Sequence, residues 1–198
     1  MFEEILAGLA SRLREAEIPY MVIGGLAVLL YGEPRMTRDI DVTLGVTPDR
    51  LADVLRVVES LSLRPLVDDP ASFVSRTMVL PVIHERTGVR VDLIFSFTGY
   101  ESQAIERATR VEVLDEEVCF ASVEDLVIHK LFAARPRDLE DVVSVLKRHP
   151  DLDVDYVRGW LREFQAAMPE EHYLKNLENT LRRAAEPGAG RPTDDGGI

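Results

Sequence analysis

Residues 20–46 read YMVIGGLAVLLYGEPRMTRDIDVTLGV. The first four of these residues predict a short buried strand, which leads directly into Gly24 and Gly25. The apolar residues 26–31 predict a helix, and the alternation of apolar and polar residues in 40–46 predicts a second strand. The order strand, glycine turn, helix and strand is therefore the predicted centre of the fold.

The patterns outside this stretch predict both strands and helices at first, and helices alone towards the end of the chain. Apolar or alternating runs predict strands at 78–84, 89–97, 110–114 and 117–120. Apolar residues at helical spacing predict helices at 2–13, 48–58, 100–108, 122–134, 138–148, 154–167 and 169–185.

We predict an α+β fold class, in which a small mixed β-sheet core is flanked by helices and followed by a C-terminal helical layer. The core comprises residues 1–121, and the helical region 122–185 packs on it. The tail 186–198 is rich in glycine and proline, and its apolar surface is too small to offset the entropy of ordering it. We expect this tail to be disordered.

Composition limits the partners that the protein can have. A formal net charge of −12 and a pI near 4.8 create a field that repels nucleic acid in general. The single cysteine, Cys119, cannot form an internal disulfide, which is typical of a reducing compartment. No basic leader and no apolar run of membrane-spanning length is found, so we expect a cytoplasmic protein without a membrane partner.

Two carboxylates share one face of the strand predicted at 40–46, if the strand is extended by the residue before it. Because side chains alternate along a strand, Asp39, Asp41 and Thr43 point to the face opposite the apolar residues. Carboxylates about 7 Å apart repel each other unless a divalent ion lies between them. A metal site and a solvent-facing strand decorated with aspartates both fit this pattern.

A third aspartate interrupts the apolar strand predicted at 89–97. Aspartate has poor strand propensity, and burying its charge costs several kcal/mol unless the carboxylate is paired or bound to metal. Asp92 is therefore a candidate third metal ligand. The alternative is a salt bridge to Arg90 or Arg38.

The glycine pair and the residues before Asp39 are candidates for binding phosphate. Gly24 and Gly25 lie between a strand and a helix, where the backbone can approach a ligand and the helix offers unpaired N–H groups. Thr37 and Arg38, together with Arg35, add hydroxyl and guanidinium donors. A tight turn without a ligand is the alternative, because no Walker-type lysine follows the glycines.

Taken together, residues 20–97 resemble the DNA polymerase beta superfamily of nucleotidyltransferases. The resemblance implies that Asp39, Asp41 and Asp92 hold two Mg²⁺ ions, with Mn²⁺ as a substitute, around a nucleoside triphosphate such as ATP. It also implies that the glycine turn holds the phosphates. Many members carry Gly-Ser at this turn, so the Gly-Gly pair of this chain lacks one hydroxyl contact.

A downstream segment narrows the resemblance to the AbiEii-like toxin nucleotidyltransferases. The residues that carry it are Glu124, Asp125, Leu126, His129, Lys130, Leu131, Arg135, Arg137, Asp138 and Asp141. In that branch a helix lysine contacts the nucleotide and a basic-acidic motif lies near the active site, which implies a nucleotide-binding Lys130 and a catalytic Asp138. The alternative is a solvated helix N-terminus, where acidic residues are favoured by the helix dipole.

The expected function is Mg-dependent transfer of a nucleoside monophosphate to an acceptor hydroxyl on an RNA end such as tRNA, a protein or a small molecule. The AbiEii-like resemblance adds a toxin role with a cognate antitoxin as partner. One alternative is a non-catalytic nucleotide- or partner-binding protein that keeps the fold, and another is a metal-dependent phosphodiesterase. The four histidines lack metal-ligand spacing and are expected to be surface or packing residues.

Overall fold

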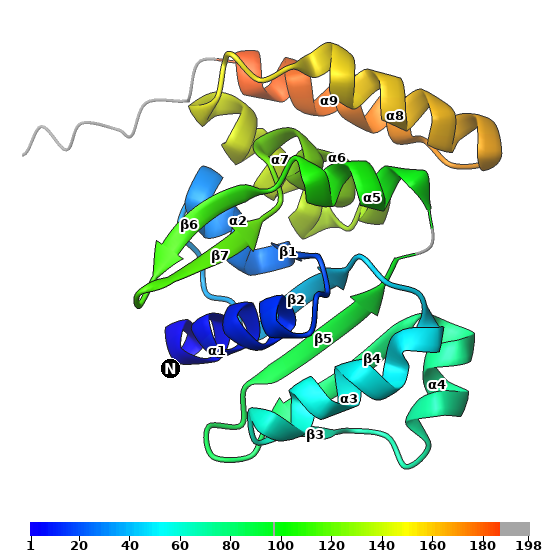
Figure 1. The fold of residues 1–198 in the computed structure, drawn as a ribbon. Coiled ribbons are helices and arrows are strands. Elements are labelled where there is room, and N and C mark those ends of the chain that lie inside the picture. Colours follow the sequence, from blue (N-terminus) through cyan, green and yellow to red (C-terminus); the bar gives the residue numbers. More distant parts are fainter. Residues whose placement is uncertain (97, 187–198) are drawn as a thin grey trace, which may run out of the picture.

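The computed structural model describes residues 1–96 and 98–186. A seven-stranded sheet lies at its centre (Figure 1). The strands are β1 (Tyr20–Ile23), β2 (Asp39–Leu44), β3 (Leu63–Pro65), β4 (Val79–His84), β5 (Arg90–Phe95), β6 (Thr109–Val113) and β7 (Glu116–Phe120). The helices are α1 (Phe2–Glu15), α2 (Gly24–Tyr31), α3 (Leu51–Ser60), α4 (Pro70–Thr77), α5 (Gly99–Glu106), α6 (Val123–Ala133), α7 (Pro136–Arg148), α8 (Val154–Ala167) and α9 (Tyr173–Ala185).

The sheet is mixed, with the strand order β3-β4-β5-β2-β1-β7-β6. β2 pairs in parallel with β5, and β1 pairs in parallel with β7, whereas the other neighbours are antiparallel. The central strands β2 and β5 thus lie side by side although a long segment of chain separates them. This arrangement confirms the predicted α+β class with a mixed sheet.

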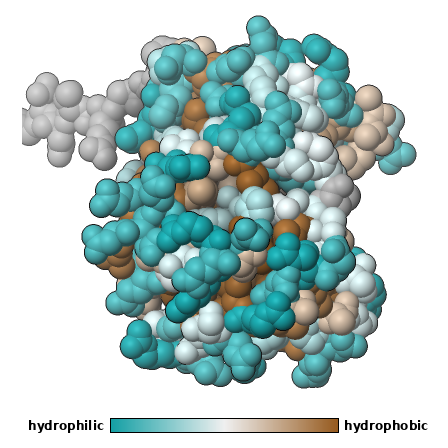
Figure 2. Space-filling view, viewed as in Figure 1, coloured by the Kyte–Doolittle hydropathy of each residue, from teal (hydrophilic) through white to brown (hydrophobic). Residues whose placement is uncertain are grey.

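Helices cover the sheet in layers. α1 contacts both α3 and β7, while α2 contacts β1, β2 and α6. Figure 1 shows α8 and α9 as the outermost layer, with α6 between them and the sheet. The face seen in Figure 2 is largely hydrophilic, as expected for a chain with a net charge of −12.

One contiguous core joins the strands to the helices of both halves of the chain. It includes Leu13 of α1, Val42 of β2, Leu93 of β5 and Leu131 of α6, all of which have no exposed side-chain surface. Each fully buried aliphatic side chain of this kind stabilises the fold by about 1.5–3 kcal/mol. The helical region 122–185 therefore shares its core with the sheet.

Two elements were not predicted from the sequence. α4 begins after Asp69, whose carboxylate accepts a hydrogen bond from the Ser72 N–H at 3.0 Å, and Pro70 is its first residue. An N-cap aspartate followed by proline is a recognisable helix start, so the signal was present in the sequence. β3 has three residues, which is too short for an alternation pattern to reveal.

Element boundaries also differ from the prediction in places. α9 begins at Tyr173 and not at residue 169, and β5 ends at Phe95. α5 begins at Gly99, because Thr98 and Glu101 form a capping box in front of it. The tail predicted to be disordered lies outside the described residues, apart from Glu186. Across the described residues, no helix is both long enough and apolar enough to span a membrane.

Candidate active site

Parallel pairing of β2 with β5 brings the predicted carboxylates onto one face of the sheet. The register places Asp41 opposite Asp92, and Asp39 opposite Arg90. On the other side of β2, the antiparallel register places Ile23 opposite Asp41. Partners in register point to the same face, so Asp41 and Asp92 are direct neighbours, each partly exposed.

The glycine turn lies against the beginning of β2. Gly24 has φ +67°, and a Cβ atom at this position would overlap Oδ2 of Asp41. A Cβ on Gly25 would lie 2.5 Å from Oγ1 of Thr37, which is also too close. A side chain at either position would therefore displace the side chain of Asp41 or Thr37, and Gly24 in addition adopts a positive φ that favours glycine.

The electrostatic environment of Asp41 is strained in the absence of a cation. Burial, together with the negative charges of Asp39 and Asp92, raises the pKa of Asp41 to about 6. Lys130 and Arg135 act in the opposite direction and favour the ionised carboxylate. A carboxylate with this environment is stabilised when a positive charge binds next to it.

Asp92 has the partner that one of the two alternatives predicted. Nε of Arg90 donates a hydrogen bond to Oδ1 of Asp92 at 3.0 Å. In the described ranges, 1–96 and 98–186, no three carboxylate, histidine or cysteine side chains converge into a ready metal cluster. Arg90 is half exposed, with a side-chain accessibility of 52%, so this ion pair lies at the solvent edge of the site.

The chemistry of these donors fits a divalent cation of the magnesium type. Carboxylate oxygens are the hard ligands that Mg²⁺ prefers. Asp39, Asp41 and Asp92 supply such oxygens from the adjacent strands β2 and β5. The three residues are therefore the candidate ligands for such an ion.

Lys130 and Asp138 form part of a buried ionic network. Nζ of Lys130 lies 2.7 Å from Oδ1 of Asp138 and 2.9 Å from Oδ2 of Asp141. Nε and Nη2 of Arg35 donate hydrogen bonds to Oδ1 and Oδ2 of Asp141, at 2.8 and 2.9 Å. The network ties α6 and α7 to the segment that precedes β2.

The burial of this network decides between the two interpretations of the start of α7. Asp141 is only 5% exposed, so the solvated-terminus alternative is wrong for this residue. Asp138 is also buried, at 7% exposure, and it lies in the first turn of α7, where the helix dipole favours an acidic residue. Oδ2 of Asp138 is buried and finds no hydrogen-bond partner among the described residues. Asp138 pairs with Lys130 and does not lie on the face of the sheet that carries Asp41. The charge of Lys130 also lowers the pKa of Asp41, so Lys130 connects the network to that face.

Sequence reasoning did not assign separate roles to Asp141 and Arg135, which the fold brings to this region. Asp141 completes the network, and the charge of Arg135 acts on Asp41. Arg35, a candidate for binding phosphate, instead pairs with Asp141. Asp141 lies three residues after Asp138 on one helix, which is the spacing that places two side chains on one face. That spacing was a usable signal, whereas the pairing with Arg35 across the chain was not.

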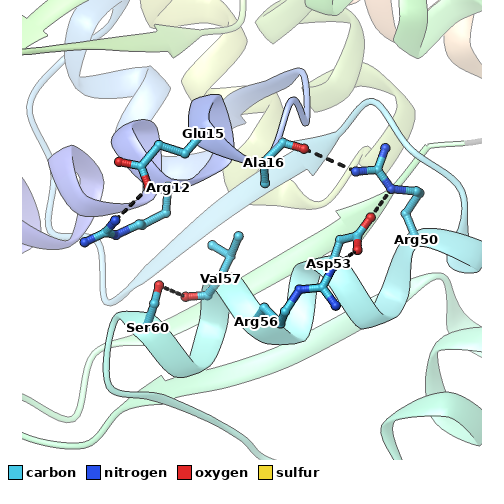
Figure 3. A pocket seen from close by; sticks show the side chains of 8 residues that line it. All are labelled: Arg12, Glu15, Ala16, Arg50, Asp53, Arg56, Val57 and Ser60. Carbon is cyan, nitrogen blue, oxygen red and sulfur yellow. Dashed lines mark hydrogen bonds and ion pairs between the residues drawn. The ribbon is translucent and has the colours of Figure 1, made fainter.

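The surface hollow shown in Figure 3 lies between α1 and α3 and contains none of the candidate residues. Its guanidinium groups are already engaged: Arg12 pairs with Glu15 at 2.6 Å, while Arg50 and Arg56 both pair with Asp53. Paired charges at a solvated surface add little binding energy for an incoming anion. This hollow is therefore not a second phosphate site.

Comparison with known structures places the fold among nucleotidyltransferases. The solution structure of the antibiotic-resistance factor ANT(2'')-Ia superimposes on this chain with a TM-score of 0.59 at 16% identity, covering 85% of this chain and 95% of that chain. An antigenic nucleotidyltransferase-like protein from Paracoccidioides brasiliensis superimposes with a TM-score of 0.55 at 17% identity, covering 91% and 92%. At these identities the likeness concerns the fold.

No curated protein matches the chain in sequence. A family model does match it, over residues 1–185, which is nearly the whole chain. This protein belongs to the family described as "Nucleotidyltransferase of unknown function (DUF6036)".

Proposed function

We propose that this protein transfers a nucleoside monophosphate from a nucleoside triphosphate to a hydroxyl group of a small-molecule acceptor. The observation that carries the proposal is the register of β2 and β5, which sets Asp41 beside Asp92 next to the glycine turn. Asp39, Asp41 and Asp92 would hold Mg²⁺, which when bound neutralises charge on the phosphates and polarises the reacting phosphorus.

The residues of the chain have distinct parts in the proposed reaction. The free N–H groups at the start of α2, after Gly24, face phosphate oxygens, and the exposed Arg38 adds a guanidinium. The acceptor oxygen forms a bond to the α-phosphorus while the bond to the β-phosphate oxygen breaks and pyrophosphate leaves. Asp92 takes the proton of the acceptor hydroxyl.

Lys130 and Asp138 act together in this proposal. Lys130 is held by two buried carboxylates, so its ammonium group has a defined position and its charge is only partly available to a ligand. We assign Lys130 electrostatic support of the nucleotide phosphates and of the carboxylate row, which is formed by Asp39, Asp41 and Asp92. Asp138, whose Oδ2 is unpartnered in the described chain, orients Lys130.

A small-molecule acceptor is favoured over RNA by charge. A net charge of −12 opposes the approach of a polyanion, because phosphate contacts require a cationic surface. ANT(2'')-Ia has been solved in complex with adenylyl-2''-tobramycin, with a TM-score of 0.50 at 16% identity, covering 92% of this chain and 98% of that chain. We extend only the class, a small hydroxyl-bearing molecule, to this chain.

The first experiment is calorimetric titration of non-hydrolysable nucleoside triphosphates with magnesium into the wild type and into Asp39→Asn/Asp41→Asn. We expect binding that requires both the magnesium and the aspartates, and comparison of the four bases identifies the preferred one. A folded wild type that binds none of the four would favour the non-catalytic alternative. Loss of binding in a double variant that has lost its fold would be uninformative, so its circular dichroism spectrum is recorded alongside.

The toxin role implied by the AbiEii-like resemblance is kept as a separate proposal. It rests on the residues of 124–141 that carry that resemblance, and Lys130 and Asp138 of this segment lie in the buried network. If the protein is a toxin, induced expression of the wild type arrests growth of a bacterial host, whereas Asp41→Asn does not. Equal growth of both cultures would contradict the toxin role and leave the transferase proposal unaffected.

A further inference from the structure

A cavity of about 430 Å³ adjoins the carboxylate row on the same face of the sheet. Thr43 and Ile94 line its floor, each two residues further along its strand than Asp41 and Asp92. α6 and α8 form its walls with Phe132 and Phe164. Ligand sites in proteins commonly measure about 300–1,000 Å³, so the cavity has the size of a small-molecule site.

The walls are mostly apolar and aromatic. Phe132 and Phe164 pack edge to face with ring centroids 5.5 Å apart, and Phe132 is 46% exposed at the mouth. The charged residue of the lining is Glu101, and its carboxylate already accepts hydrogen bonds from the backbone and side chain of Thr98. A charged ligand therefore finds no free counter-charge on these walls, whereas an apolar one removes exposed aromatic surface from water.

Two buried polar atoms without partners lie among these apolar side chains. Within the described residues, Oγ1 of Thr43 and Nε2 of His129 make no hydrogen bond, and Thr43 is only 1% exposed. Burial lowers the pKa of His129, so its imidazole is neutral near pH 7. Unpartnered buried polar groups are unfavourable, and a ligand that hydrogen-bonds them removes this penalty.

The position of the cavity relative to the glycine turn indicates which substrate it would hold. β1 runs antiparallel to β2, with Tyr20 opposite Leu44 and Ile23 opposite Asp41, so the turn after Ile23 lies towards the Asp39 end of β2. The cavity begins at Ile23, opposite Asp41, and extends along β2 to Thr43, away from the Asp39 end. Attacking and leaving oxygens are roughly in line in phosphoryl transfer, so pyrophosphate at the turn places the acceptor on the cavity side.

We infer that this cavity, lined by Thr43, Ile94, His129, Phe132, Phe164 and Ala167, binds the acceptor, and that the acceptor is an uncharged small molecule with an apolar body and a hydroxyl group. The ligand's role as acceptor rests on the proposed nucleotidyl transfer. Its chemical class rests on the cavity alone. A polycationic acceptor is not expected, because the carboxylate of Glu101, the charged group of the lining, is already hydrogen-bonded to Thr98.

The test is calorimetric titration of 2-naphthol, an uncharged molecule with an apolar body and a hydroxyl, into the wild type and two variants in which an alanine of α8 is replaced by phenylalanine. Ala167 is exposed and lines the cavity, so Ala167→Phe fills the mouth without disturbing the core, and Ala166→Phe on the same helix is the matched control. We expect Ala167→Phe to weaken binding at least about tenfold and Ala166→Phe to change it less than about twofold. Spermine is expected not to bind the cavity.

The same titration in the presence of magnesium and a non-hydrolysable triphosphate separates this inference from the proposed function. Simultaneous binding of both ligands supports the acceptor site, and displacement of 2-naphthol by the nucleotide overturns it, because the cavity would then hold the base. No binding of 2-naphthol, or equal binding to both variants, also overturns it. Binding of 2-naphthol by a protein that binds no nucleotide leaves the ligand chemistry standing and refutes the transferase.

Discussion

Asp41 is the residue at which stability and the proposed chemistry oppose each other. In the proposed reaction its carboxylate holds a cation, yet burial and the nearby charges of Asp39 and Asp92 disfavour its ionised form in the metal-free protein. Active sites commonly hold such perturbed groups, because the arrangement that serves the ligand is unfavourable without it. The cost has a measurable dependence on pH.

Asp41→Asn is expected to stabilise the metal-free protein near neutral pH by on the order of 1–2 kcal/mol, less than the full shift implies because Asp41 is partly exposed. The folded pKa of about 6 exceeds the ordinary value of 3.8, so the native state binds more protons between these values. Wild-type stability therefore falls as pH rises from about 4 to about 6, and the variant lacks this fall.

Urea unfolding in the presence of a chelator, repeated at several pH values, measures this difference. Asp151→Asn is the control, because Asp151 is an exposed aspartate whose neutralisation should leave the profile unchanged. Parallel profiles of wild type and Asp41→Asn would show that the carboxylate is not under strain.

Gly24 is the second residue with a specific consequence. Gly24→Ala introduces both a strained backbone at φ +67° and an overlap with Asp41, whereas Gly88→Ala introduces only the strain, since φ is +70° and nothing lies within 4 Å. We expect Gly88→Ala to cost about 1 kcal/mol and to leave nucleotide binding intact. Gly24→Ala is expected to cost more and to weaken triphosphate binding at least about tenfold. Equal effects of the two substitutions on triphosphate binding would show that the glycine turn is not part of the nucleotide site.

At the scale of elements, the ionic network holds α6, α7 and the segment before β2 in one arrangement. Lys130 is the centre of this network, because it neutralises both Asp138 and Asp141 while Arg35 supports Asp141 from the other side. Buried charges of this kind are costly to leave unpaired. The relative placement of α6 and α7 thus depends on the network as well as on apolar packing.

Lys130→Met is expected to destabilise the protein by about 3 kcal/mol, because it leaves two buried carboxylates with one cation between them. Adding Asp138→Asn should restore part of the loss by removing one of the charges. Chemical denaturation of the single and double variants gives both values, with Lys147→Met on the exposed part of α7 as reference. A loss no larger than that of Lys147→Met would mean that the network contributes nothing to stability.

At the scale of the whole molecule, the sheet and the C-terminal helices are parts of one core. Leu126, Val127 and Ile128 of α6 are fully buried in the same cluster as the strands. Hydrogen bonds also cross the predicted division at residue 121, since the Tyr100 hydroxyl reaches the carbonyl of Asp125. The region 122–185 completes the core and does not merely rest on it.

A chain that ends at residue 121 is therefore expected not to fold cooperatively, because its sheet would expose the surface that α6 covers. A chain that ends at residue 186 should unfold with the same transition as the full protein. Circular dichroism during urea unfolding distinguishes the two cases. A cooperative transition in the shorter chain would show that 1–121 is an independent domain, as its predicted boundary suggests.

The sequence by itself determined most of the strands and most of the helices, because alternation and helical spacing record which side of each element is buried. It also placed Asp39 and Asp41 on one face of a strand, since that follows from backbone geometry alone. It did not reveal β3, which is too short to alternate, and the cap that starts α4 was a local signal left unused.

Only the tertiary structure decided the neighbours of these elements. The register of Asp41 with Asp92, the partners of Lys130 and the apolar cavity beside Thr43 all depend on residues that are distant in the chain. No local pattern encodes such contacts, because strand order and helix packing are chosen by burial of the whole core. His129, expected to be an ordinary packing residue, acquires its proposed role only because the fold leaves its buried Nε2 beside an unfilled cavity.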